Sequence, residues 1–270
     1  MSKTLLITGA TDGIGRATAE HLAADGHTLV LHGRNTDKLA VVADALRRVP
    51  GAGTVRTHRA DLTRYADTVQ LAEAVAADVG SIDVLINNAG VFTLADPITP
   101  AGFDARFIVN TVAPYVLTHR LAAVMPVGSR VINLSSAAQA PVDLDALLGK
   151  RRLAAGDAYA QSKLALTMWS FELASTLVRS GPAVIAVNPG SFLASKMVKD
   201  AYGLPGHDLA IGAQVLARAA LGNDFANAAG RYFDNDRGQF AEPHPDALDG
   251  GRNAAVIAAI EQVIRTLAGH

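Results

Sequence analysis

The chain has 270 residues, 50% of them hydrophobic, and a formal net charge of −1. This length and apolar content suffice for one large α/β domain with an ample core, and the near-zero charge gives no basic field for nucleic acid or an anionic membrane. The absence of cysteine excludes disulfides and thiolate chemistry and fits a reducing compartment. No apolar run approaches the ~18 residues that span a bilayer, so we expect a cytoplasmic protein without nucleic-acid or membrane partners.

The first predicted element is a short apolar strand, Thr4–Ile7, which leads into a glycine-rich turn and then a helical pattern at residues 16–24. Glycines at a strand-to-helix turn let the backbone approach a pyrophosphate, and the helix N-terminus supplies free N–H groups and a positive dipole. A tight turn that merely needs glycine is the alternative, but three glycines with this spacing favour a dinucleotide site. The candidate cofactor residues here are Gly9, Thr11, Asp12, Gly13, Ile14 and Gly15.

The second predicted strand, at residues 28–31, is followed by His32, Gly33 and Arg34, without an acidic residue. In dinucleotide folds an acid at this place binds the ribose 2′-hydroxyl and would repel a 2′-phosphate. Arg34 instead offers a planar and permanently charged guanidinium to a phosphate, although an ordinary surface arginine is the alternative. The pattern predicts that NADP(H) is preferred, with NAD(H) as a second usable cofactor.

Strand and helix patterns alternate through the rest of the chain. Further strands are predicted at 54–59, Val84–Asn87, Arg130–Leu134 and 183–187, and helices at 36–49, 65–78, 102–124 and 159–179. This alternation predicts a single α/β domain over residues 1–270, with a Rossmann-type, doubly wound parallel sheet and helices on both faces. The segment at about 191–211 leaves a strand at the edge where such sheets bind ligands, so we expect it to shape a substrate pocket; a loop without function is the alternative.

Two polar residues of the helix at 159–179 point to proton transfer. Tyr159 and Lys163 are four residues apart, so they project from one face of the helix. A cation near a phenol favours the phenolate, which makes Tyr159 a candidate proton carrier near neutral pH. This pair alone occurs often by chance, and its weight comes from the glycine turn upstream.

Together these motifs resemble those of the short-chain dehydrogenase/reductase family. The family's signatures occur in its order, as Thr8 to Gly15, Asn87-Asn88-Ala89-Gly90, Ser135-Ser136, and Tyr159 with Lys163. Asp61-Leu62 and Asn188-Pro189-Gly190 also match family positions. The spacing between Ser136 and Tyr159, and Gly230-Arg231-Tyr232-Phe233, resemble the retinol-dehydrogenase-like branch, which usually uses NADP. Asp12, however, stands where NADP-preferring relatives often carry a base.

The resemblance implies an oxidoreductase that moves a hydride between NADP(H) and a carbonyl/alcohol pair on a small, apolar substrate. It implies that Tyr159 carries the proton, and that Lys163 favours the phenolate and holds the nicotinamide ribose. Ser136, rather than the strand-end Ser135, would hydrogen-bond the substrate oxygen, and Asn110 would support a water chain from Lys163 to solvent.

The resemblance also implies cofactor contacts beyond the glycine turn. These are Asp61 and Leu62 at the adenine edge, Asn88, Ala89 and Gly90 near the ribose, and Pro189 and Gly190 after the sixth strand. For Asp61 a carboxylate that starts a helix is the alternative. Asn87 is expected to steady the central sheet. The eight histidines lack ligand spacing, so no metal site is expected.

Two other functions use the same kind of fold. One is an NADP-binding sensor without turnover, which typically lacks the Tyr/Lys pair that this chain retains. The other is a sugar-nucleotide epimerase or dehydratase, which usually needs a larger C-terminal substrate domain. Relatives are commonly dimers or tetramers built on the helices that hold Asn110 and Tyr159, so we expect a homo-oligomer that acts on a small-molecule carbonyl or alcohol.

Overall fold

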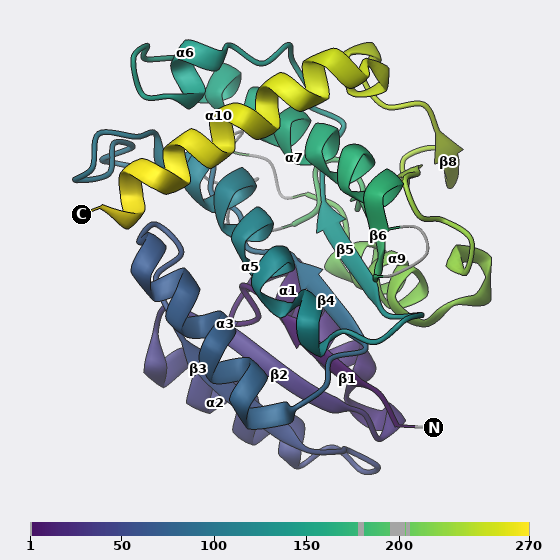
Figure 1. Cartoon of the computed structure of the whole chain (residues 1–270). Coiled ribbons are helices and arrows are strands. Elements are labelled where there is room, and N and C mark those ends of the chain that lie inside the picture. The colour runs from purple at the N-terminus through teal and green to yellow at the C-terminus, as the bar shows by residue number, and fades with distance from the viewer. Residues whose placement is uncertain (1, 178–180, 195–202, 204–205, 270) are drawn as a thin grey trace.

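An eight-stranded sheet forms the centre of the molecule, with helices on both faces (Figure 1). The computed structural model describes residues 2–177, 181–194, 203 and 206–269. The strand order is β3-β2-β1-β4-β5-β6-β7-β8, and neighbouring strands are parallel except for the antiparallel pair β7 and β8. The strands are β1 (Thr4–Ile7), β2 (Thr28–Gly33), β3 (Val55–Arg59), β4 (Val84–Asn87), β5 (Arg130–Leu134), β6 (Ala183–Asn188), β7 (Tyr232–Asp234) and β8 (Gln239–Ala241). The predicted fold class is confirmed.

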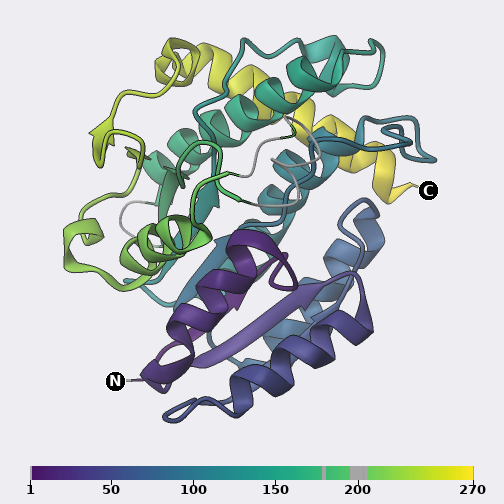
Figure 2. The same ribbon diagram turned by 180° about the vertical axis from the view of Figure 1, so that it is seen from behind.

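The helices form two layers, one on each face of the sheet (Figures 1 and 2). One layer holds α1 (Gly13–Leu22), α2 (Thr36–Arg47) and α9 (Leu209–Leu221), with α1 packed on α9. The other holds α3 (Tyr65–Val79), α5 (Ala113–Leu121) and α7 (Ala155–Leu177), and α10 (Gly250–Ala268) packs on α7. The shorter helical segments are η1 (Ala23–Asp25), α4 (Ala105–Phe107), the π-helical η2 (Ile108–Val112), η3 (Ala122–Val124), α6 (Leu144–Leu147), η4 (Asn223–Phe225) and η5 (Pro245–Leu248).

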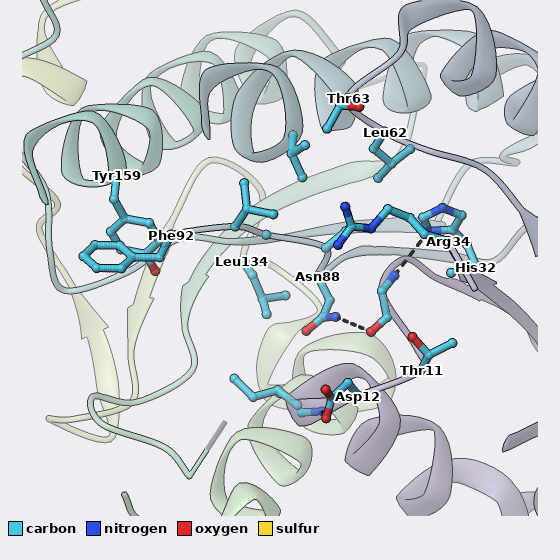
Figure 3. Close-up of a pocket in the computed structure, with 18 of the residues that line it drawn as sticks. Thr11, Asp12, His32, Arg34, Leu62, Thr63, Asn88, Phe92, Leu134 and Tyr159 are labelled. Carbon is cyan, nitrogen blue, oxygen red and sulfur yellow. Dashed lines mark hydrogen bonds between the residues drawn. The ribbon is translucent and has the colours of Figure 1, made fainter. Parts of the chain in front are cut away.

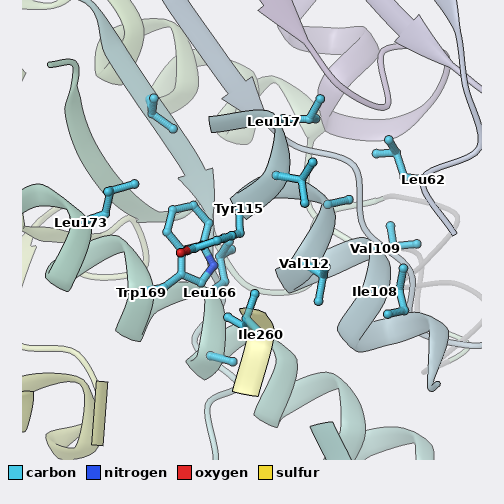
Figure 4. Packing of buried hydrophobic residues seen from close by; sticks show 14 of the residues in the cluster. Leu62, Ile108, Val109, Val112, Tyr115, Leu117, Leu166, Trp169, Leu173 and Ile260 are labelled. Atoms are coloured by element: carbon cyan, nitrogen blue, oxygen red, sulfur yellow. The ribbon is translucent and has the colours of Figure 1, made fainter. Parts of the chain in front are cut away.

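Alternate side chains of the strands supply two separate hydrophobic cores. In β1, Leu6 packs with the layer of α3, α5 and α7, whereas Leu5 and Ile7 pack with the layer of α1, α2 and α9. Successive side chains of a strand point to opposite faces, and both faces are covered along the central strands, so those strands are largely apolar. Figure 4 shows the first core, in which the buried Trp169 meets the Tyr115 ring edge-on at 5.6 Å between ring centroids.

One helical segment is more apolar than the sequence analysis allowed. Among the described residues, Ala105–Val124 is the one segment long and apolar enough to cross a membrane by length and composition. In the fold, 72% of its apolar window is buried, and α5 packs against α3 and α7. Core packing therefore accounts for its apolar composition. The segment also differs from the predicted single helix at 102–124, because the π-helical turn Ile108–Val112 interrupts it.

The C-terminal part of the sheet was not predicted. Strands β7 and β8 have three residues each, which is too short to carry a period-of-two pattern. They extend the sheet beyond β6, where β7 pairs in parallel with Ala186–Asn188. Helix α9 begins at Leu209, inside the predicted substrate segment at 191–211. Residues 195–202, 204 and 205 of that segment lie outside the described residues.

Candidate active site

A cavity opens where the strand order reverses, at the carboxyl ends of β1 and β4 (Figure 3). Open α/β sheets bind ligands at this place. The cavity has a volume of about 370 Å³. The predicted site residues that line it are Gly9, Thr11, Asp12, Gly13, Ile14, Arg34, Asp61, Leu62, Asn88, Ala89, Gly90, Tyr159, Lys163 and Pro189. Four others, Gly15, Asn110, Ser136 and Gly190, lie outside its lining.

The glycine turn is closed tightly against the end of β4. Gly9 and Gly13 have φ angles of 67° and 53°, which side chains rarely tolerate. A Cβ atom on Gly15 would collide with the Asn88 side chain and the Gly9 carbonyl. Asp12 caps α1, accepting the Gly13 N–H at 2.8 Å. The turn therefore brings the N-terminus of α1 to the cavity, where its free N–H groups favour an anion.

Asn88 and Thr8 hold this turn to the sheet. The Asn88 Nδ2 donates to the carbonyls of Thr8 at 2.8 Å and Gly9 at 3.2 Å. The Thr8 Oγ1 accepts the N–H groups of Asn88 and Ala89, both at 3.0 Å. Asn88 thus frames the turn as well as lining the cavity. The preceding Asn87 is buried and donates to Asn133 Oδ1 of β5 at 2.8 Å, as a sheet-steadying residue should.

His32 is a site residue that the sequence analysis missed. Its ring is 2% exposed; Nδ1 accepts the Gly9 N–H at 3.3 Å, and Nε2 lies 3.2 Å from the Ala60 carbonyl. Burial lowers the pKa of His32 to about 4, so the ring is neutral at pH 7 and its Nε2 carries the proton that Ala60 accepts. His32 therefore ties the glycine turn to the end of β3. A polar residue near the end of an apolar strand, two residues before Arg34, was the available signal.

Two arginines lie beyond His32 at the ends of β2 and β3. Figure 3 shows Arg34 extending along the cavity between His32 and Asn88. The Arg59 Nε donates to the Arg34 carbonyl at 3.2 Å.

Nearby, Asp61 Oδ1 accepts both the N–H and the hydroxyl of Thr63, at 3.0 and 2.8 Å. Asp61 thus closes a turn before α3, whose N-cap is Arg64, so the helix-capping alternative for Asp61 is wrong.

The structure brings Tyr159 and Lys163 together at the other end of the cavity. The Lys163 Nζ lies 5.7 Å from the Tyr159 ring centroid and donates to the Leu134 carbonyl at 2.7 Å. Lys163 is buried, and burial lowers its pKa to about 8. The Tyr159 ring meets Phe92 edge-on at 4.7 Å between centroids. An ammonium ion thus stands beside a phenol within a partly apolar pocket.

The two adjacent serines after β5 have different environments. Ser135 is buried, and its Oγ shares a hydrogen bond of 2.7 Å with Thr167 Oγ1 of α7. Ser136 is half-buried, and its Oγ accepts the Ala138 N–H at 3.1 Å. The Ser135 hydroxyl is therefore committed to the packing of α7 on the sheet, which leaves Ser136 as the serine nearer to solvent.

Asn110 lies in the π-helical turn and is fully engaged with neighbouring groups. Its Oδ1 accepts the Val91 N–H at 2.8 Å, and its Nδ2 donates to the Val91 carbonyl and to Ser162 Oγ, both at 3.0 Å. Ser162 Oγ in turn donates to the Tyr159 carbonyl at 2.7 Å. The Asn110 amide therefore fastens the loop after β4 to α7. The water chain implied by the family resemblance stays a prediction.

The end of β6 is anchored to the turn between β7 and β8. Asn235 Nδ2 donates to the Pro189 carbonyl at 2.9 Å, and Asp236 accepts the Ser191 N–H at 2.7 Å. Gly190 has a φ of 118°, and Phe192 has a φ of 51°, rare for a side chain of its size. The described start of the substrate segment is thus held in a defined conformation.

Among the described residues, no group of His, Cys, Asp and Glu side chains is placed to hold a metal ion.

Comparison with known proteins yields one family over most of the chain. A family model described as short chain dehydrogenase matches residues 3–202. Mouse retinol dehydrogenase 13 is 32% identical over 268 residues, which cover 92% of this chain and 79% of the mouse protein.

Two solved structures with a bound cofactor are similar over most of their length. One is the angucycline C-6 ketoreductase LanV with bound NADP, with 30% identity and a TM-score of 0.69 over 86% of this chain and 93% of that one. The other is a blue fluorescent protein from a metagenomic library in complex with NADPH, with 28% identity and a TM-score of 0.70 over 89% and 98%.

The fold, the cavity at its switch point and these relatives define an oxidoreductase with a Rossmann-type fold. Within that class, the chain belongs to the short-chain dehydrogenase family, in its retinol-dehydrogenase-like branch.

Proposed function

We propose that this protein transfers a hydride between NADP(H) and the carbonyl/alcohol pair of a small, apolar substrate. The observation that carries the proposal is the placement of Tyr159 and Lys163 at one end of a cavity whose other end holds the glycine turn and Arg34. One end suits phosphate groups and the other suits proton transfer, as a dinucleotide-dependent reaction requires.

The residues around the turn fit a phosphorylated dinucleotide. The N-terminus of α1 would face the pyrophosphate, and Arg34 would face the 2′-phosphate, with its backbone held by Arg59. No acid stands at the end of β2 to repel that phosphate. The NADP and NADPH bound in the two structural neighbours support the same preference. NAD(H) stays a second usable cofactor.

When bound, the nicotinamide would supply or accept the hydride. Tyr159 would give the proton of its hydroxyl to the substrate oxygen during reduction, and Lys163 would favour the resulting phenolate. With a pKa of about 8, Lys163 is still mostly charged at pH 7. Ser136 would donate a hydrogen bond to the same oxygen. Asn110 would keep the loop after β4 in place beside Tyr159.

The substrate side of the cavity supports an apolar ligand. Phe92 and Leu94 line it, and Leu193 is buried at the start of the 191–211 segment, which we propose shapes the substrate pocket. Met197, in the same segment, lies outside the described residues. The relatives include a retinol dehydrogenase and an angucycline ketoreductase, which supports an alcohol or carbonyl substrate.

Two further expectations stay proposals. The first is a homo-oligomer built on the helices of Asn110 and Tyr159; α10 packs on α7, so such an interface would include the outer face of α10. The second is a cytoplasmic location without a membrane partner.

Tyr159→Phe tests the proposed reaction directly. We expect turnover of NADPH with a panel of aliphatic, aromatic and polycyclic ketones to fall about 100-fold or more, because the proton carrier is lost. The NADPH dissociation constant should stay within about twofold of wild type, since the ring and Lys163 stay in place. Tyr115→Phe, whose hydroxyl contacts Glu261 of α10, is the matched control and should keep full activity.

Two results would count against the proposal. A wild-type protein that binds NADPH and reduces no carbonyl would indicate a sensor. An active Tyr159→Phe variant would show that another group carries the proton.

A further inference from the structure

The main-chain carbonyl of Ser136 accepts two side-chain hydrogen bonds. The Gln139 Nε2 donates at 2.9 Å and the Tyr232 hydroxyl at 3.1 Å. Tyr232 lies 96 residues further along the chain, in β7, and its side chain is 5% exposed. Gln139 is itself held by the His244 N–H, which donates to its Oε1 at 3.2 Å. The C-terminal part of the chain thus reaches Ser136, in the segment that follows β5.

The sheet determines where the Tyr232 hydroxyl lies. Tyr232 pairs with Ala186 of β6 and with Ala241 of β8, so its backbone is held on both sides. Burial, assisted by nearby Asp234, raises the pKa of Tyr232, so the hydroxyl stays protonated at neutral pH and can act as a donor. Ser136, in contrast, lies two residues beyond the end of β5 at Leu134. The side chains of Gln139 and Tyr232 therefore help to orient the Ser136 peptide group.

We propose that Tyr232 is a positioning residue for Ser136: its hydroxyl fixes the peptide group of Ser136 and thereby the direction of the Ser136 hydroxyl toward the substrate oxygen. This inference rests on the proposed function, in which Ser136 contacts that oxygen. Catalytic groups must be held within a few tenths of an ångström of a productive geometry, and hydrogen bonds to their backbone are one means of holding them.

A double-mutant cycle of Tyr232→Phe and Ser136→Ala tests the inference. The carbonyl substrate is the most active compound of the ketone panel. Tyr232→Phe deletes one oxygen and should lower kcat roughly three- to tenfold, the change expected from one hydrogen bond, with KM for NADPH unchanged. In the Ser136→Ala background the same change should have no further effect on kcat, because Tyr232 acts only through Ser136. Thermal unfolding of all four proteins monitors the fold.

A purely structural role would give a different result. Tyr232→Phe would then lower kcat by the same factor in both backgrounds, in step with a loss of thermal stability, and this would overturn the inference. Tyr115→Phe, which removes a buried tyrosine hydroxyl from α5, is the control for that stability effect.

The cycle also separates this inference from the proposed function. If Ser136→Ala lowers kcat and Tyr232→Phe does not, only the positioning role of Tyr232 fails. If Ser136→Ala leaves kcat unchanged, the role of Ser136 and the inference both fail, while Tyr159→Phe still reports on the reaction itself.

Discussion

Arg34 is the residue through which we expect the protein to distinguish NADP(H) from NAD(H). A guanidinium can bind a phosphate through two charge-assisted hydrogen bonds, which contribute about 1.5–3 kcal/mol. Arg34→Ala should therefore weaken NADPH binding roughly ten- to hundredfold and leave NADH binding almost unchanged. Both dissociation constants should be measured at one ionic strength, because salt screens the interaction.

Arg56→Ala is a suitable control for Arg34, because it removes the same charge from β3 at a residue paired with Asp78. Equal losses for NADPH and NADH in Arg34→Ala would contradict the assignment. The reverse experiment places an acid at Gly33, where it would repel the 2′-phosphate. This substitution also adds a Cβ atom, so its effect would not be purely electrostatic. A Cβ atom there would lie 2.6 Å from Thr11 Cγ2, so the Thr11 side chain would have to shift.

Burial of the charged Lys163 beside Tyr159 lowers the stability of the folded state. Burial lowers its pKa from 10.5 to about 8, so the folded state binds this proton less tightly than the unfolded state does. The charged form therefore destabilises the fold below pH 8, and this penalty disappears as the pH rises from about 8 to 10.5. Lys163→Met keeps the length and removes the charge, so it should abolish turnover while raising the free energy of unfolding at pH 7 by about 1–3 kcal/mol.

Urea unfolding of wild type and Lys163→Met at pH 7 and pH 10 measures this effect. At pH 7 the free energy of unfolding should be higher for Lys163→Met than for wild type. This difference should shrink at pH 10, where the wild-type lysine is neutral when folded. A variant that is less stable than wild type at pH 7 would mean that the hydrogen bond to the Leu134 carbonyl outweighs the desolvation of the charge.

At the scale of elements, the π-helical turn Ile108–Val112 turns Asn110 toward the loop after β4. Asn110→Ala would leave the N–H and carbonyl of Val91 without these partners. We expect this to lower kcat about tenfold or more and the free energy of unfolding by about 1–3 kcal/mol. Hydrogen exchange of the Val91 amide should become faster.

Asn110→Asp is the matched variant, because it keeps the acceptor for the Val91 N–H and loses the donor to the Val91 carbonyl. Its Val91 amide should exchange more slowly than that of Asn110→Ala. Unchanged exchange in both variants would show that the loop does not depend on Asn110.

For the whole molecule, the cavity collects residues from the carboxyl ends of several strands and from both helix layers. A cofactor bound there should stabilise the entire fold. At one hundred times its dissociation constant, a ligand adds about 2.7 kcal/mol to the free energy of unfolding. NADPH should then raise Tm by roughly 5–10 °C, at about 2–4 °C per kcal/mol.

Differential scanning fluorimetry with equal concentrations of NADPH and NADH measures this shift. NADPH should give the larger rise in wild type and in Tyr159→Phe, and the difference should vanish in Arg34→Ala. A protein whose Tm responds to neither cofactor would contradict the dinucleotide site.

The sequence by itself determined the Rossmann-type sheet, six of its eight strands and the main cofactor motifs. Thr4–Ile7, Val84–Asn87 and Arg130–Leu134 are mostly apolar because both faces of the central sheet are buried, and this pattern is local. The glycine turn and the Tyr159–Lys163 spacing are local as well, since each depends on backbone geometry over a few residues.

Only the tertiary structure decided which distant groups meet. His32 joins Gly9 to Ala60, Asn110 holds Val91, and Tyr232 reaches Ser136. None of these contacts follows from periodicity, because each partner is chosen by the packing of separate strands and loops. The three-residue β7 was invisible for the same reason, since pairing with β6, and not its own pattern, makes it a strand.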